Sequence, residues 1–63
     1  MTKKEIKKVA KELAKLEQTL RTSEGDDRYR AEMAIMTLTS KVEDMEDMMA
    51  IDELVMQLLE QEN

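Results

Sequence analysis

The stretch TSEGDD, residues 22–27, holds the only glycine of this 63-residue chain, which has no proline. Glycine readily takes the positive φ angles found at helix ends, and either of the two following carboxylates, Asp26 or Asp27, can cap a new helix. The stretch therefore predicts a turn between two helices. The predicted elements are a helix at about residues 3–22, a turn at about 23–26 and a helix at about 27–61.

Before the turn, apolar residues recur in alternating steps of three and four, the period of a helix side that packs against another helix. Thr2, with Glu5 three residues later, predicts a capping box at the start of this helix. Ala10 and Ala14 flank the apolar stripe and permit close approach of a neighbour. The stripe consists of Ile6, Val9, Leu13, Leu16 and Leu20.

After the turn, the same period continues without a glycine or proline to stop it. At about 1.5 Å per residue the two helices would be about 30 and 52 Å long. In an antiparallel hairpin Met1 would lie near Asp47, and residues 48–59 would have no partner within the chain. The continuing stripe consists of Ala31, Ile35, Leu38, Val42, Met45 and Met49.

These lengths predict an all-α fold. We expect an antiparallel helical hairpin with a long second helix, forming a single domain over residues 1–63. Because so small a chain has little apolar area for a core, we expect it to self-associate into a helical bundle, most simply a two-fold dimer.

One alternative divides the second helix. Ser40 with Glu43 three residues later is a second capping-box pattern. A break near Ser40 would give a three-helix bundle that buries its own C-terminal segment. We favour the continuous helix because the apolar stripe passes through Leu38 and Val42 without a change of phase.

The C-terminal segment is the most apolar part of the chain, and its stripe changes register at Asp52. A helix that is apolar around so much of its circumference is normally covered by more than one neighbour. We therefore expect an interface here, with self-contact favoured over a foreign partner. The predicted interface consists of Met45, Met48, Met49, Ile51, Val55, Met56, Leu58 and Leu59, with an acidic rim of Glu43, Asp44, Glu46, Asp47, Asp52 and Glu53.

The net charge of −5 is unevenly distributed. Residues 1–21 carry seven Lys or Arg and three Glu, whereas residues 22–63 carry three Lys or Arg and twelve Asp or Glu. A lysine stripe on the first helix has the spacing to contact phosphates along a nucleic acid. It has no arginine or aromatic residue to read or stack on bases, so we favour a solvated face. The stripe consists of Lys4, Lys8, Lys11 and Lys15.

The composition argues against an enzyme. The chain lacks histidine and cysteine, the commonest agents of acid–base, nucleophilic and zinc chemistry at neutral pH. A straight helix converges carboxylates poorly on a metal ion, so we expect no metal and no cofactor. No apolar run approaches the ~18 residues of a membrane span, and no leader pattern follows Met1, so we expect a cytoplasmic location.

Taken together, these features predict a non-enzymatic protein–protein interaction module. The favoured form is a small acidic homo-oligomeric regulator or inhibitor that binds a larger protein, of the kind that phages and mobile elements encode. Its many methionines suit a surface that adapts to a partner. Two alternatives stay open: a structural or assembly subunit, and a small RNA-binding dimer that uses the lysine stripe.

Overall fold

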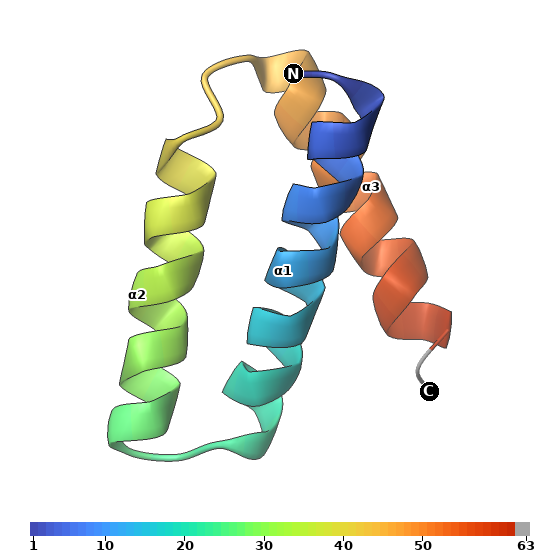
Figure 1. The fold of residues 1–63 in the computed structure, drawn as a ribbon. Coiled ribbons are helices and arrows are strands. Elements are labelled where there is room, and N and C mark those ends of the chain that lie inside the picture. The colour runs from blue at the N-terminus through green and yellow to red at the C-terminus, as the bar shows by residue number, and fades with distance from the viewer. Residues whose placement is uncertain (62–63) are drawn as a thin grey trace.

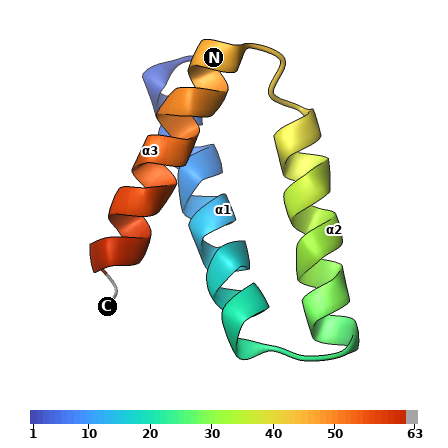
Figure 2. The same ribbon diagram turned by 180° about the vertical axis from the view of Figure 1, so that it is seen from behind.

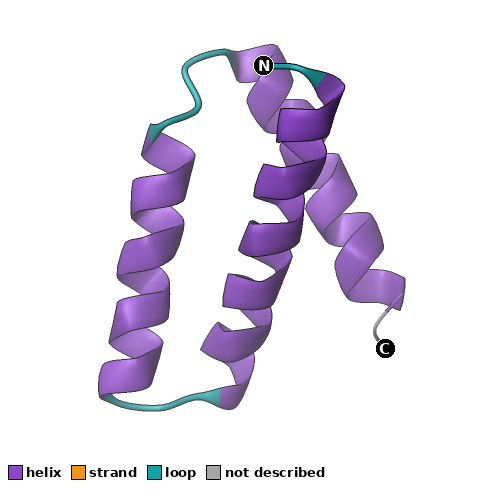
Figure 3. Ribbon diagram, in the orientation of Figure 1, coloured by secondary structure: helices purple, strands orange, loops and turns teal. Residues whose placement is uncertain are grey.

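The structure, a computed structural model, describes residues 1–61, and that part of the chain contains three helices and no strand. The prediction of an all-α protein is confirmed. α2 returns antiparallel to α1 on one side, and α3 then runs parallel to α1 on another side (Figure 1 and Figure 2). Short loops join the helices (Figure 3). The helices are α1 (Lys3–Thr22), α2 (Asp26–Ser40) and α3 (Met45–Gln61).

The predicted capping box begins α1. The Thr2 hydroxyl accepts a hydrogen bond from the Glu5 backbone N–H at 3.1 Å, and the Glu5 carboxylate accepts one from the Thr2 backbone N–H at 3.2 Å. Two of the N–H groups that a helix start leaves unpaired are satisfied in this way. At the other end Arg21 lies in the last turn, where a cation suits the helix dipole.

The first turn uses its glycine at the start of α2. Gly25 has φ 67°, a positive value that only glycine adopts without strain, and it is the N-cap residue of α2. The prediction that Asp26 or Asp27 caps this helix is wrong, because both lie within its first turn and the N-cap position is taken by Gly25, which makes no side-chain capping bond. Their carboxylates still stand at the positive end of the helix dipole.

The favoured prediction of one continuous helix over residues 27–61 is wrong. The helix stops at Ser40 and a new one starts at Met45, so the alternative break near Ser40 is the arrangement found. The chain therefore folds its apolar C-terminal segment back on α1, and residues 48–59 do not extend beyond the first helix.

Side chains near the break compete with the helical backbone. The Thr39 hydroxyl donates to the Ile35 carbonyl at 2.9 Å, and the Ser40 hydroxyl donates to the Thr37 carbonyl at 2.8 Å. Such bonds offer carbonyls an alternative to helix continuation. Backbone bonds from Lys41 to the Leu38 carbonyl and from Val42 to the Thr39 carbonyl then tighten the last turn.

The cap of α3 differs from the one that the alternative implied. Asp44, rather than Ser40, precedes the helix, and its carboxylate accepts a hydrogen bond from the Glu46 backbone N–H at 2.9 Å. Its own carbonyl accepts from the Met48 N–H at 3.0 Å. Asp44 thus makes the bonds typical of an N-cap residue, while Ser40 ends the preceding helix.

Met1 lies beside Asp47, as the hairpin predicted. The Met1 α-amino group contacts the Asp47 carboxylate at 3.1 Å. The route is different, however, because the chain turns back at this level instead of continuing past the end of α1. The predicted proximity was right although the predicted path was not.

The core is small and lies along α1. α2 and α3 each pack on α1 and hardly touch one another. Small side chains on α1 permit this close packing on two sides, as the alanines flanking its apolar stripe suggested. Among the described residues, those buried are Ala10, Leu13, Ala14, Ala31 and Ile51, all of them apolar. The partly buried residues around the cluster of Ala10, Leu13 and Ile51 are Ile6, Val9, Ile35, Leu38, Val42, Met48, Leu54, Val55 and Leu58.

Candidate interaction surface

The predicted interface on α3 divides into an inner and an outer side. Ile51 is completely buried, with 0% of its surface exposed, and belongs to the core cluster. Met48, Val55 and Leu58 are half-buried against that cluster. These four residues were predicted to form an intermolecular surface and instead pack within the chain. The reason is the break after Ser40, which brings this side of α3 onto α1.

The outer side of α3 keeps its exposed methionines. Met45, Met49 and Met56 are 77%, 66% and 64% exposed, whereas Leu59 is half-buried. Steps of four and seven residues place the three methionines on one stripe of the helix. Met49 lies two residues from Ile51, which is about 200° around the helix axis, so this stripe faces away from α1. We call Met45, Met49 and Met56 the α3 methionine stripe.

A second exposed apolar stripe lies on α2. Tyr29, Met33 and Met36 are all exposed and are spaced by four and three residues, while Ala31 is buried on the other side. We call these three residues the α2 stripe. Sequence reasoning missed it as a surface, since it traced only the inner positions of this segment. The signal was present as a second apolar repeat displaced by two residues from the first.

The predicted acidic rim does not stay together. Asp44 caps α3 and Asp47 bonds the Met1 amine, so both carboxylates are used within the chain. Glu46, Asp52 and Glu53 are exposed on α3 beside its methionine stripe, while Glu43 lies in the loop before that helix. Among the described residues no group of acidic side chains is arranged to hold a metal ion.

Among residues 1–61 two ionisable groups have shifted pKa values, and both shifts arise from contacts at the start of α1. The hydrogen bond to Asp47, reinforced by its charge, raises the pKa of the Met1 α-amino group. The backbone and side-chain hydrogen bonds from Thr2 lower the pKa of Glu5. Both groups are exposed, and their shifts report the N-terminal contact and the capping box.

The lysine stripe of α1 is exposed along its whole length. Ion pairs among residues 1–61 join Met1 to Asp47 and Arg28 to Glu32, and they leave the α1 lysines without a carboxylate partner. The structure brings Lys4, Lys8 and Lys11 to a shallow hollow on the surface of α1. Lys15 lies further along the same helix.

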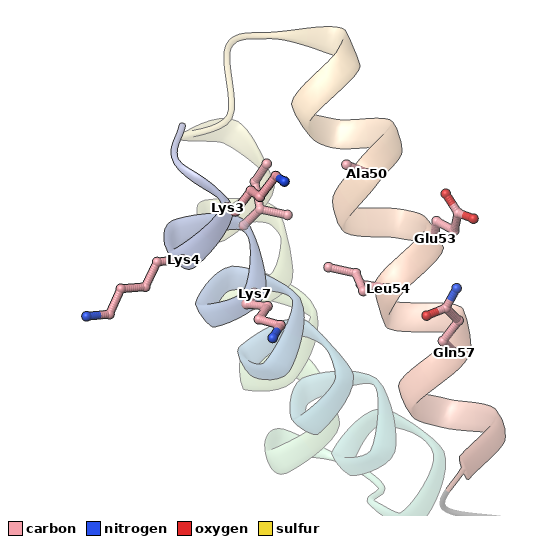
Figure 4. A pocket seen from close by; sticks show the side chains of 8 residues that line it. Lys3, Lys4, Lys7, Ala50, Glu53, Leu54 and Gln57 are labelled. Atoms are coloured by element: carbon pink, nitrogen blue, oxygen red, sulfur yellow. The ribbon is translucent and has the colours of Figure 1, made fainter.

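A larger groove runs between the first half of α1 and the middle of α3. It has a volume of about 760 Å³ and an apolar floor that includes Ile6, Ala50 and Leu54. Figure 4 shows Leu54 pointing toward α1, with Glu53 and Gln57 on the outer side of α3. The groove is lined by Lys3, Lys4, Ile6, Lys7, Ala50, Glu53, Leu54 and Gln57.

The chain exposes more surface than a compact protein of its size. Its accessible surface is 5088 Å², whereas a compact monomer of 7.4 kDa exposes about 4,200 Å². Its Cα radius of gyration of 11.7 Å also exceeds the roughly 10.6 Å expected for this length. The excess area, on the order of 900 Å², is close to the roughly 800 Å² that each partner buries in a standard interface.

In the part of the chain that the structure describes, no helix has the length and apolar character to cross a membrane. Comparison of the chain with protein-family models, curated proteins and solved structures found no match.

Proposed function

We propose that this chain is a non-enzymatic protein–protein interaction module that acts as a homodimer and regulates or inhibits a larger protein. The observation that carries the proposal is the pair of exposed apolar stripes on α2 and α3, on a chain with about 900 Å² of surplus surface. A small chain in which only five of residues 1–61 are buried gains stability by covering such surface in an oligomer.

The two stripes support a division of roles. The α3 methionine stripe serves self-association, and the α2 stripe of Tyr29, Met33 and Met36 remains available to the larger protein. Methionine side chains are flexible and polarizable, and therefore adapt to surfaces of irregular shape. Tyr29 adds the one aromatic side chain of the sequence, of a type enriched where protein surfaces bind one another.

Sedimentation equilibrium at micromolar concentration tests the self-association. We expect a dimer for the wild-type chain and at least tenfold weaker association for Met49→Asp, because a buried carboxylate without a partner is costly. Thr37→Asp is the matched control, since Thr37 is exposed and lies outside both stripes. A folded wild-type monomer would refute the dimer.

The role of the α2 stripe has a separate test. A tagged chain is used to retain host proteins, and the retained proteins are compared between wild type, Met36→Asp and Thr37→Asp. We expect one larger protein to be lost with Met36→Asp alone, while the dimer stays intact. Retention by all three chains would place the foreign contact elsewhere.

A further inference from the structure

The groove between α1 and α3 combines an apolar floor with uncompensated positive charge. Ile6 and Leu54 lie in its floor, and the ammonium groups of Lys3 and Lys7 stand at its α1 side. Within residues 1–61 neither lysine forms an ion pair, because Glu53, which also lines the groove, lies on the outer side of α3 (Figure 4). Such a groove fits an amphipathic helix that carries carboxylates next to apolar side chains.

A helix with this pattern is present in the chain itself. Glu46, Glu53 and Glu60 recur every seven residues on α3, and Met49 and Met56 follow the first two of them by three residues. Residues at these spacings share one side of a helix. All five side chains are exposed, and we call them the acidic–methionine ridge.

We propose that α3 of a second copy of this chain lies in the groove between α1 and α3, and that the contact is reciprocal about a two-fold axis. The inference rests on the self-association proposed above and specifies its geometry. We place the axis perpendicular to α3, so that the two α3 helices of the dimer run antiparallel to each other. The four helices of the contact are then α1 and α3 of each copy.

The charges of the two surfaces match in this arrangement. With the axis beside Leu54, residues 51–57 of the two α3 helices lie side by side in opposite directions. The second copy's Glu60 then comes to the level of Lys3, and its Glu53 to the level of Lys7. Both carboxylates meet lysines that have no ion-pair partner within the chain.

A second copy is favoured over other occupants for two reasons. Both halves of the contact, the groove and the ridge, are exposed on the same chain and are complementary in charge. The surplus area of about 900 Å² also matches what one partner of a stable dimer buries. A nucleic acid would use the lysines but would leave the apolar floor and the methionines uncovered.

A charge-swap experiment tests the pairing. Variant one is Lys3→Glu with Lys7→Glu, and variant two is Glu53→Lys with Glu60→Lys. The new charges suit the helix dipoles, since the first pair lies near the start of α1 and Glu60 lies in the last turn of α3. Helix content is checked by circular dichroism, and association by sedimentation equilibrium at low ionic strength.

We expect each variant alone to dimerise about tenfold more weakly than wild type, because like charges then face each other. An equimolar mixture should form a heterodimer of nearly wild-type affinity, since every groove then meets a ridge of opposite charge. The control, Lys15→Glu with Lys41→Glu, makes the same charge change as variant one at exposed positions outside the groove and should dimerise normally.

Other outcomes would overturn the proposal. If both variants dimerise like wild type, or if the mixture shows no preference for the heterodimer, the dimer exists but does not use this groove. If the control weakens the dimer as much as variant one, the effect is one of overall charge. A folded wild-type monomer would refute self-association altogether, and RNA binding by that monomer, lost in variant one, would assign the lysines to nucleic acid.

Discussion

At the scale of single residues, Ile51 decides whether α3 belongs to the core or to the surface. Among residues 1–61 it is the one large side chain that is fully buried, and it contacts a cluster on α1. The sequence indicated that Ile51 would be buried, but not by which chain. Other apolar residues of α3, such as Met49 and Met56, lie on its opposite side, and only the direction of α3 after the loop decides which side faces α1.

Replacing this side chain should be costly. Ile51→Ala leaves a cavity in a very small core, so we expect the free energy of unfolding to fall by about 2–5 kcal/mol. In a chain of this size such a loss can abolish folding. Urea unfolding followed by circular dichroism measures it.

Met36→Ala is the control for this experiment. Met36 is 64% exposed, so we expect a change of less than about 0.5 kcal/mol. An Ile51→Ala chain as stable as Met36→Ala would show that α3 does not pack on α1 as described.

At the scale of helices, the sequence predicted α1 well and the remainder less well. The capping box and the regular apolar stripe of α1 are local signals. They suffice to predict this helix because the capping box marks its start and the turn with Gly25 follows its end. The break after Ser40 has no glycine or proline, and the apolar stripe crosses it in phase. The break costs a helical turn at residues 41–44 and is compensated by the burial of α3 on α1. That burial is a tertiary contact, which the local sequence around Ser40 does not reveal.

The cap at the start of α3 is a testable part of that balance. The Asp44 carboxylate bonds the Glu46 N–H, and its charge stands at the positive end of the helix dipole. We expect Asp44→Ala to lower the free energy of unfolding by about 0.5–2 kcal/mol, and Asp44→Asn, which keeps a capping oxygen, to cost less. Urea unfolding of the two variants compares them directly.

The helix content of the same variants gives a second readout. If Asp44 maintains the break, Asp44→Ala should shift the balance toward a helix that continues through residues 41–44, and helix content should not fall. A variant with unchanged stability would indicate that tertiary packing alone holds the break.

At the scale of the whole molecule, the candidate surface was predicted in part. Met45, Met49 and Met56 are exposed on one stripe of α3, whereas the sequence had placed Met45 and Met49 on the apolar stripe that continues Leu38 and Val42 toward the first helix. The argument that led to them, an unpaired length of helix, was wrong, and the α2 stripe was missed. Apolar side chains remain exposed on α2 and α3 because the sequence has more apolar positions than the three helices bury.

This surplus makes stability depend on concentration if the chain dimerises as we propose. Mass action favours the folded dimer over two unfolded chains as the protein concentration rises. Each tenfold increase is worth about 1.4 kcal/mol per dimer, which for two chains of this length corresponds to about 5 °C in Tm. Thermal unfolding can be followed by circular dichroism over a hundredfold range of protein concentration that begins in the low micromolar range. The Tm should rise by about 10 °C across that range. Met49→Asp should weaken the dependence of Tm on concentration, whereas Thr37→Asp should not. If the wild-type Tm does not depend on concentration, the exposed stripes stay uncovered in the free protein.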